Sequence, residues 1–354
     1  MNRMKKNLYL TNIEVPYRVA FFNELSKYCD LTVVYERRQS QNRDSKWANC
    51  CIGNYKTIFL DGHITIGRES SFSFQIINIL KLKWDVVVIG CYNSIVQIFS
   101  IAIMRLLGIP YIINVDGEPF IGSGIKAKIK SQILKGAKAY LVAGSNACQS
   151  LKNIIGNSAI VIPYYFSSLS KEEIYNNCKF NCSRNKTVLV VGQYLEYKGM
   201  DIALDVAKMD KNIKYKFIGM GNRTNKFIED SNEIPYNVEI IPFLQKEDLN
   251  QEYKHCGVLM LPTRQECWGL VINEAASFGM PIVSTWGSGA AIEFLAKDYP
   301  AYLAEPSNSK SLYKSLRLCL SNNNDGYSQY LKDKSKLYSI ERNVEVYMSI
   351  INNL

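Results

Sequence analysis

Short apolar segments rich in Val, Ile and Tyr alternate along this chain with longer segments whose apolar residues recur at helical spacing. This alternation predicts parallel β-sheets, because each parallel strand returns to its sheet through a crossover helix. In the first half, strands are expected at residues 7–10, 31–35, 85–89, 111–115 and 139–142. A second series is expected at residues 187–191, 215–218, 238–241, 257–261 and 281–284. The sequence therefore predicts an α/β protein with two doubly wound, Rossmann-like domains.

The length of 354 residues is sufficient for two domains. A polar stretch over residues 167–186 separates the two series and suits a domain junction. We expect a first domain over residues 1–165, a second over 166–334, and an amphipathic C-terminal helix over 335–354 that packs back toward the first domain. Because doubly wound sheets bind ligands at the carboxyl ends of their strands, we expect the ligand in a cleft between the facing domains.

The net charge of +10 is concentrated in one half of the chain. Residues 1–163 hold 20 Lys or Arg against 10 Asp or Glu, and the remaining residues are balanced. Such an asymmetry indicates an anionic partner for the first half, which can be nucleic acid, an anionic membrane surface or a phosphorylated substrate. Nucleic acid is the least supported of the three, because this half carries no recognition-helix or RNA-binding signature.

One segment of the basic half has the pattern of a membrane-surface helix. Ile125, Ile129 and Ile133 form one helical stripe. The lysines around it are Lys126, Lys128, Lys130, Lys135 and Lys138. A basic amphipathic helix can lie on an anionic membrane, although a core stripe with a solvated lysine face gives the same pattern. We expect a cytoplasmic protein, peripheral on the inner face of the cytoplasmic membrane, because the longest apolar stretch, residues 95–109, is too short to span a bilayer.

The sequence offers little support for a metal site. Most of the ten cysteines lie in apolar runs, and neither histidine is near a cysteine pair. No two aspartates are spaced as D-x-D, a pattern that would suit a metal-bridged diphosphate. We therefore expect neither a metal nor an organic cofactor.

The segment richest in candidate site residues follows the strand expected at residues 257–261. A polar loop carries Glu266, and a helix begins near Gly269, so the N–H groups of Gly269, Leu270 and Val271 are expected to lack partners and to bind an anion such as a diphosphate. Glu266 and Glu274 flank this position and can accept hydrogen bonds from sugar hydroxyls. An ordinary helix start with nearby acidic residues is the alternative interpretation.

Two glycine turns precede this segment in the chain. Gly192 and Gln193 follow a strand, and Lys198 lies six residues after Gly192 at a helix start, where it can reach a phosphate or simply be a surface lysine. The run Gly219-Met220-Gly221 follows the next strand. This run also permits a nicotinamide-dependent oxidoreductase or epimerase with Glu239 as the ribose acid, but Thr224 replaces the third glycine of that fingerprint.

Together these elements resemble the donor-binding domain of the retaining nucleotide-sugar glycosyltransferases of glycosyltransferase family 4. Residues 192–199 are similar to the family's G-R-L-x-x-x-K-G element, residues 266–274 to its E-x7-E motif, and residues 274–283 to its E-A-x-x-x-G-x-P-V/I-V run. The resemblance covers residues 188–306. The opening segment, residues 11–22, resembles bacterial members that build capsule and O-antigen polysaccharides.

The resemblance implies a GT-B fold, a UDP- or GDP-sugar donor in the second domain, an acceptor in the first domain, no metal, and retention of configuration. It assigns the donor phosphates to Lys198 and the Gly269–Val271 amides, the ribose to Glu274 and the transferred sugar to Glu266. Gln193, Gly219 and Phe243 complete the expected donor site. Gln193 stands where the family usually has a phosphate-binding arginine, a role that Arg18 or Arg264 could share. Pro242 replaces a common glycine beside Phe243.

The first domain lacks the histidine that the family often places near the sugar, and Asp116-Gly117-Glu118 occupies the corresponding strand end. Asp116 can bind a sugar hydroxyl or polarise the acceptor hydroxyl, or it can simply begin a turn. We take Glu266, Lys198 and Asp116 as the catalytic candidates, and Arg18 and Glu118 as candidates for contacts with the acceptor or a phosphate.

The predicted activity is retaining sugar transfer to a lipid-diphosphate-linked saccharide in bacterial surface polysaccharide biosynthesis. A non-catalytic sugar-nucleotide-binding protein is a further alternative.

Overall fold

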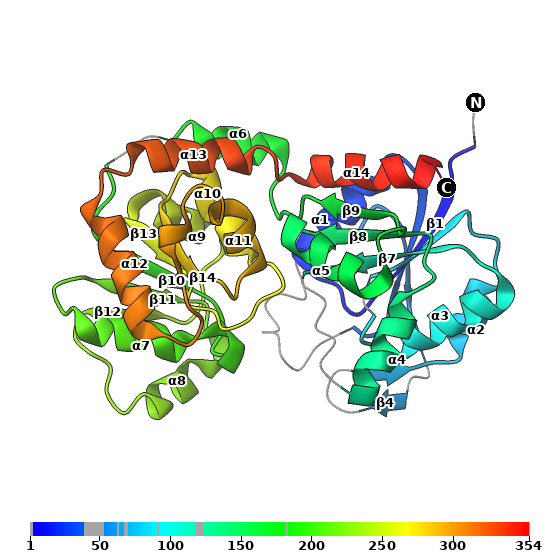
Figure 1. Cartoon of the computed structure of the whole chain (residues 1–354), viewed down its shortest axis with the longest axis horizontal. Coiled ribbons are helices and arrows are strands. Elements are labelled where there is room, and N and C mark those ends of the chain that lie inside the picture. Colours follow the sequence, from blue (N-terminus) through cyan, green and yellow to red (C-terminus); the bar gives the residue numbers. More distant parts are fainter. Residues whose placement is uncertain are drawn as a thin grey trace. The chain divides into compact units, whose positions relative to one another are not determined.

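The computed structural model describes residues 3–38, 53–61, 64–66, 70–90, 92–117, 124–180 and 183–353. The chain divides into two compact units, the first formed by Met1–Ser168 with Ile340–Leu354 and the second by Leu169–Ser339. These divisions fall a few residues after the positions chosen from sequence. Each unit contains one parallel sheet with helices packed on it (Figure 1).

The sheet of the first unit has seven parallel strands in the order β3-β2-β1-β6-β7-β8-β9. Its strands are β1 (Lys6–Thr11), β2 (Asp30–Tyr35), β3 (Lys56–Phe59), β6 (Val86–Ile89), β7 (Tyr111–Val115), β8 (Ala139–Ala143) and β9 (Val161–Tyr164). A separate antiparallel hairpin is formed by β4 (Ile64–Ile66) and β5 (Ser70–Phe72). Neither edge strand is predicted by the sequence pattern, because β3 begins with two exposed polar residues and β9 contains Pro163, a residue that sheets tolerate at an edge.

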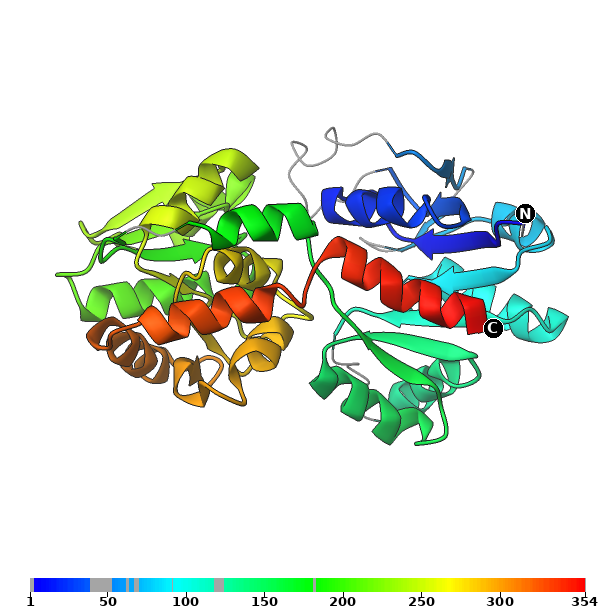
Figure 2. The ribbon, with the colours of Figure 1, turned by 90° about the horizontal axis from the view of Figure 1, so that it is seen from above.

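Six helices belong to the described residues of the first unit. They are α1 (Pro16–Leu25), α2 (Gln75–Leu80), α3 (Ile95–Leu107), α4 (Gly124–Leu134), α5 (Ser145–Ile155) and α14 (Ile340–Asn353). Local sequence explains the bounds of α3: the Ser94 hydroxyl accepts a hydrogen bond from the N–H of Gln97 at its start, and Gly108 ends it with φ +66°. Helix α14 is the last element of the chain and packs beside α1, as two views show (Figures 1 and 2).

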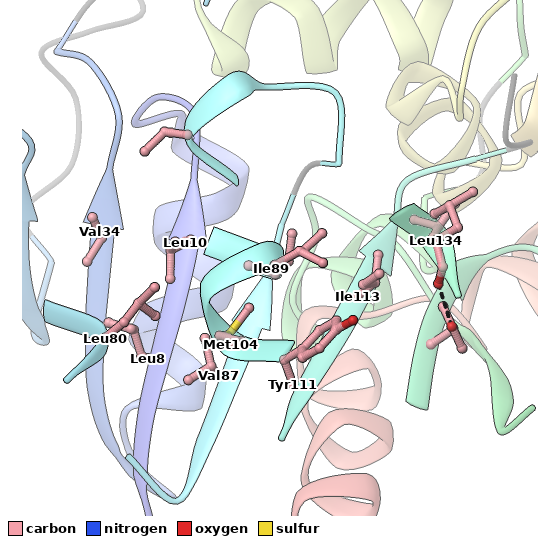
Figure 3. Close-up of a cluster of buried hydrophobic side chains, with 14 of the residues drawn as sticks. Leu8, Leu10, Val34, Leu80, Val87, Ile89, Met104, Tyr111, Ile113 and Leu134 are labelled. Atoms are coloured by element: carbon pink, nitrogen blue, oxygen red, sulfur yellow. Dashed lines mark hydrogen bonds between the residues drawn. The ribbon is translucent and has the colours of Figure 1, made fainter. Parts of the chain in front are cut away.

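Alternate residues of the central strands supply the core on one face of this sheet. Leu8, Leu10 and Val34 pack there with Leu80 and Met104 from the covering helices (Figure 3). Each of these side chains is almost fully buried. Burying one such side chain stabilises the folded state by roughly 1.5–3 kcal/mol, so the packing on this face holds the strands, and the residues at their ends, in fixed positions.

The second unit has six parallel strands in the order β12-β11-β10-β13-β14-β15. They are β10 (Val188–Val191), β11 (Tyr215–Ile218), β12 (Val238–Ile241), β13 (Val258–Met260), β14 (Ile282–Thr285) and β15 (Leu303–Ala304). The main helices are α6 (Lys171–Cys178), α7 (Met200–Met209), α8 (Thr224–Asp230), α9 (Lys246–His255), α10 (Leu270–Ser277), α11 (Gly289–Leu295), α12 (Ser309–Ser321) and α13 (Asp325–Ser335). Helix α6 lies in the stretch interpreted from sequence as a junction, and a capping box of Ser170 with Glu173 begins it.

In both sheets the order in which successive strands are added reverses at one internal position. In the first unit the chain builds outward from β1 to β3 and then resumes beside β1 with β6. In the second unit it builds from β10 to β12 and resumes beside β10 with β13. Ligands of open α/β sheets bind at this switch point, outside the carboxyl ends of the strands. Within the described part of the chain, every helix is too short or too polar to cross a lipid bilayer.

Candidate active site

Lys198 and Glu266 meet at the switch point of the second unit. Lys198 ends a short 3-10 helix (Glu196–Lys198) that follows β10, and Glu266 lies in the loop that follows β13. The Lys198 ammonium forms an ion pair with Oε1 of Glu266, and the two side chains are 19% and 14% exposed. Oε2 of Glu266 is buried and has no hydrogen-bond partner in the described structure. Because an unpartnered buried carboxylate oxygen is costly, this oxygen suits a hydroxyl donor from a ligand.

The backbone around Glu266 is fixed by neighbouring loops. Its N–H donates to the carbonyl of Gly287 at 2.8 Å, and its carbonyl accepts from the N–H of Gly289 at 3.2 Å. The Thr263 hydroxyl donates to the carbonyl of Tyr197 at 2.8 Å, which ties this loop to the segment that carries Lys198. The pair is therefore held in position before any ligand binds.

Helix α10 begins directly beside this pair. Gly269 precedes it with φ +106°, a conformation that favours glycine, and a side chain there would approach the Ser288 hydroxyl to 3.1 Å. Among the described residues, the N–H groups of Gly269, Leu270 and Val271 have no acceptor, and the first hydrogen bond of the helix runs from Ile272 to the Gly269 carbonyl at 2.9 Å. These N–H groups and Lys198 together give the site positive potential suited to an anion.

Glu274 lies in α10 and is oriented by a tyrosine that the sequence analysis did not identify. The Tyr253 hydroxyl donates to Oε2 of Glu274 at 2.9 Å. Burial, together with the charge of Glu274, raises the pKa of Tyr253 well above its usual range, so the hydroxyl remains a donor. Tyr253 is 21 residues away in the chain, and no short motif joins the two.

The two glycine turns lie along the same edge of the sheet. The Gly192 N–H donates to the Ile218 carbonyl at 2.9 Å, and the Gly219 N–H donates to the Ile241 carbonyl at 3.2 Å. Gln193 and Phe243 follow the ends of β10 and β12, and both are half-buried. The structure thus places Gln193, Gly219 and Phe243 at the carboxyl edge that carries Lys198.

Two residues considered from sequence have other positions in the structure. Glu239 lies exposed inside β12, not at the carboxyl end of a strand, so it is not placed to bind a ribose held at the Gly219 turn. Arg264 donates to both carboxylate oxygens of Asp201, at 2.9 and 2.5 Å, and to the Glu196 carbonyl at 2.6 Å. Arg264 therefore braces the segment that carries Lys198 and is not available as a second phosphate cation.

The first-unit candidates Arg18 and Asp116 are brought together. Arg18 is 6% exposed, and one of its terminal nitrogens lies 2.7 and 2.5 Å from the two carboxylate oxygens of Asp116. Its other terminal nitrogen donates to the Tyr9 hydroxyl at 2.9 Å. Arg18 therefore supports Asp116, and its guanidinium is occupied by Asp116 and Tyr9. Glu118 lies outside the described residues.

The predicted basic helix is α4, and its apolar stripe is divided between core and solvent. Ile129 is 54% exposed, whereas Ile133 packs against the core. Lys128, Lys135 and Lys138 are exposed and Lys130 is half-buried, while the side chain of Lys126 lies outside the described set. Among the described residues, no three His, Cys, Asp or Glu side chains are grouped so that they could hold a metal ion.

The fold and the site together define a two-domain α/β protein of the GT-B class. A solved structure described as "Trehalose-6-phosphate from E. coli bound with UDP-2-fluoro glucose" is similar over 98% of this chain and 99% of that chain, with a TM-score of 0.72 and 11% identity. Residues 177–346 match the family model "Glycosyl transferases group 1". That part of the chain is similar to glycosyl transferases of group 1.

Two relatives are described as glycosyltransferases. An uncharacterized glycosyltransferase of Haemophilus influenzae is 32% identical over 177 residues, which are 47% of this chain and 49% of the relative. An uncharacterized glycosyltransferase of Methanocaldococcus jannaschii is 28% identical over 263 residues, 71% of this chain and 67% of the relative. The chain therefore matches about half the length of the Haemophilus relative.

Proposed function

We propose that this protein is a retaining, metal-independent glycosyltransferase that takes a sugar from a UDP- or GDP-sugar. The observation that carries the proposal is the ion pair of Lys198 with Glu266 beside the open start of α10, at the switch point of the second unit. This arrangement combines groups for an anion with a carboxylate oxygen that lacks a donor. In a nucleoside diphosphate linked to a sugar, the diphosphate supplies the anion and a sugar hydroxyl supplies the hydrogen-bond donor.

Positive charge at this site acts on the leaving group. When the bond from the anomeric carbon to the diphosphate breaks, negative charge develops on the departing oxygen. Lys198 and the N–H groups of Gly269, Leu270 and Val271 stabilise that charge, and fixed donors of this kind can contribute several kcal/mol to the transition state. They supply positive potential of the kind that a metal provides in other transferases. Glu274 binds the ribose hydroxyls and Glu266 binds the transferred sugar.

The acceptor reacts through one of its hydroxyls. Its oxygen forms the new bond on the face that the diphosphate leaves, the old bond from carbon to phosphate oxygen breaks, and the proton passes to the departing phosphate oxygen. This sequence retains the configuration of the sugar and requires no covalent enzyme intermediate. We assign the acceptor to the first unit, where Asp116 contacts its hydroxyl. A lipid-diphosphate-linked saccharide of a bacterial surface polysaccharide is the proposed acceptor, on the basis of residues 11–22.

A screen of nucleotide sugars for thermal stabilisation tests the donor proposal. We expect at least one UDP- or GDP-sugar to raise the melting temperature, since saturation at 100 times the dissociation constant is worth about 2.7 kcal/mol. Glu274→Ala should lose most of that shift. Glu247→Ala, on the exposed first turn of α9, is the matched control and should keep it. The proposal fails if no nucleotide sugar stabilises the wild-type protein.

We further propose that the first unit binds the inner face of the cytoplasmic membrane through α3 and α4. The Arg105 side chain of α3 donates to the carbonyls of Gln132 and Ile133, so the C-terminal ends of these helices are adjacent (Figure 1). Leu106 and Leu107 are 86% and 54% exposed at that end of α3. Exposed apolar side chains flanked by lysines suit an anionic bilayer, where each lysine adds about 1 kcal/mol.

Vesicle flotation tests the membrane surface. The wild-type protein should float with vesicles that contain phosphatidylglycerol and not with pure phosphatidylcholine. Leu106→Ser should weaken binding by roughly 10- to 100-fold, because burying a leucine is worth about 1.5–3 kcal/mol. Leu337→Ser is the control, because Leu337 is 54% exposed in the second unit. Equal flotation with both kinds of vesicle, or equal losses for both variants, would contradict this surface.

A further inference from the structure

Asp116 is the centre of a hydrogen-bonded cluster at the carboxyl edge of the first-unit sheet. Its Oδ1 accepts from Arg18 at 2.7 Å, from the Asn114 amide at 2.5 Å and from the Tyr164 hydroxyl at 2.7 Å. Its Oδ2 accepts only from Arg18, at 2.5 Å, among the described residues. The Asp116 side chain is 36% exposed. One oxygen is therefore saturated, whereas the other retains a lone pair in a side chain that solvent reaches.

The three donors come from three elements and are themselves buried. Arg18 lies in α1, Asn114 in β7 and Tyr164 at the end of β9, and they are 6%, 5% and 3% exposed. The Arg18 guanidinium also lies 5.5 Å from the ring centre of Phe166. Burial, together with the negative charge of Asp116, raises the pKa of Tyr164 well above its usual range, so its hydroxyl remains a donor. These contacts leave the Asp116 carboxylate a single orientation.

A simple turn does not account for this cluster. A turn-forming aspartate accepts from backbone N–H groups one or two residues ahead, whereas Asp116 accepts from three side chains, two of which lie 98 and 48 positions away in the chain. A buried ion pair is also weak as a source of stability, because the cost of desolvation offsets much of the attraction. A fold that pays this cost to leave one carboxylate oxygen accessible is better explained by a contact with a ligand.

We propose that Arg18, Asn114 and Tyr164 are positioning residues that direct Oδ2 of Asp116 toward an uncharged sugar hydroxyl of the acceptor and that this position rejects anionic groups. This inference rests on the proposed function. Asp116 orients the hydroxyl by accepting its hydrogen bond, and the proton still leaves to the departing phosphate oxygen. A phosphate at the same place would meet a carboxylate whose ion-pair partner among the described residues, Arg18, already contacts both of its oxygens, so the diphosphate of a lipid-linked acceptor must lie elsewhere.

The test uses methyl glycopyranosides and the corresponding 6-phosphates as acceptor probes with the full chain and the stabilising nucleotide sugar. Release of nucleoside diphosphate is measured at varied probe concentration. Neutral glycosides should stimulate release, and the 6-phosphates should do so at least several-fold less. Asp116→Asn should reduce the stimulation by neutral glycosides roughly tenfold, as expected when a charged hydrogen-bond acceptor is lost. The ratio of stimulation by neutral glycosides to stimulation by the 6-phosphates should also become smaller.

Tyr164→Phe and Arg18→Lys separate positioning from folding. Both should raise the KM for the glycoside several-fold, and both should keep the melting-temperature shift given by the nucleotide sugar. Tyr140→Phe is the matched control, because Tyr140 is also a buried strand tyrosine of this unit and donates to the Leu134 carbonyl at 2.5 Å. It should leave the KM unchanged.

Three outcomes would overturn the inference while the donor still binds: no stimulation of the wild-type protein by any glycoside, full stimulation in Asp116→Asn, or equal stimulation by neutral and phosphorylated glycosides. Failure of every nucleotide sugar to bind would instead overturn the proposed function, and this inference with it.

Discussion

Replacing Lys198 with methionine should lower kcat/KM for sugar transfer by on the order of 10²–10³-fold, the usual cost of removing one fixed donor to developing charge. Methionine preserves the aliphatic stem, so the substitution removes mainly the ammonium. That ammonium forms an ion pair with Glu266 and lies 5.7 Å from the ring centre of Tyr197, and the other cation candidate, Arg264, is bound to Asp201. We therefore expect no neighbouring side chain to replace it. Steady-state kinetics with the stabilising nucleotide sugar measures the effect.

The matched control for this variant is Lys216→Met. Lys216 forms an ion pair with Glu252 in the same unit at 2.9 Å, and these side chains are 27% and 18% exposed, close to the values for Lys198 and Glu266. Its removal should affect stability but leave kcat/KM within about twofold, because Lys216 lies inside β11 and not at the carboxyl end of a strand. Equal losses in the two variants would assign Lys198 a structural role only.

Gly199→Ala should lower both stability and activity. Gly199 has φ +70°, which costs a residue with a side chain about 1–2 kcal/mol, and a Cβ there would overlap the backbone carbonyl of Pro262. We expect a loss of at least about 2 kcal/mol in the free energy of unfolding and a melting temperature lower by roughly 4–8 °C. Because Gly199 directly follows Lys198, the backbone movement that relieves this overlap should also displace Lys198 and weaken donor binding.

Gly108→Ala separates the cost of a positive φ from the cost of the overlap with Pro262. Gly108 has a similar φ of +66°, but a side chain there meets no atom within 4 Å. This variant should incur only the conformational cost, about 1–2 kcal/mol, with donor binding unchanged. Thermal melts with and without the nucleotide sugar compare the two. A Gly199→Ala protein no less stable than Gly108→Ala would contradict the close approach to Pro262.

The features that sequence analysis predicts here are local in the chain. The alternation of apolar runs predicts the central strands, because sheet and helix periods differ within a few residues. The start of α10 at Leu270 is also a local feature, set by Gly269 and the apolar run after it. The capping box of Ser170 with Glu173 is a signal of the same local kind and could have predicted helix α6. The polar composition of that segment favoured a loop instead.

The features that sequence analysis missed depend on contacts between distant residues. Arg18 and Asp116 are separated by 98 positions, and only the order of the strands brings α1 next to the end of β7. Arg264 carries a charge that suits a phosphate, yet its bidentate contact with Asp201 becomes visible only when two loops are placed side by side. Composition gives the charge of a side chain but not its partner.

The second unit is proposed to recognise the diphosphate of a nucleotide sugar through Lys198 and the start of α10. Calorimetric titration of UDP and GDP into the full chain, compared with uridine and guanosine, tests this proposal most directly. At least one nucleoside diphosphate should bind roughly tenfold or more tightly than its nucleoside, a difference of about 1.4 kcal/mol, and Lys198→Met should lose most of that difference. Equal affinity for nucleoside and nucleoside diphosphate, or no binding of either, would contradict the account.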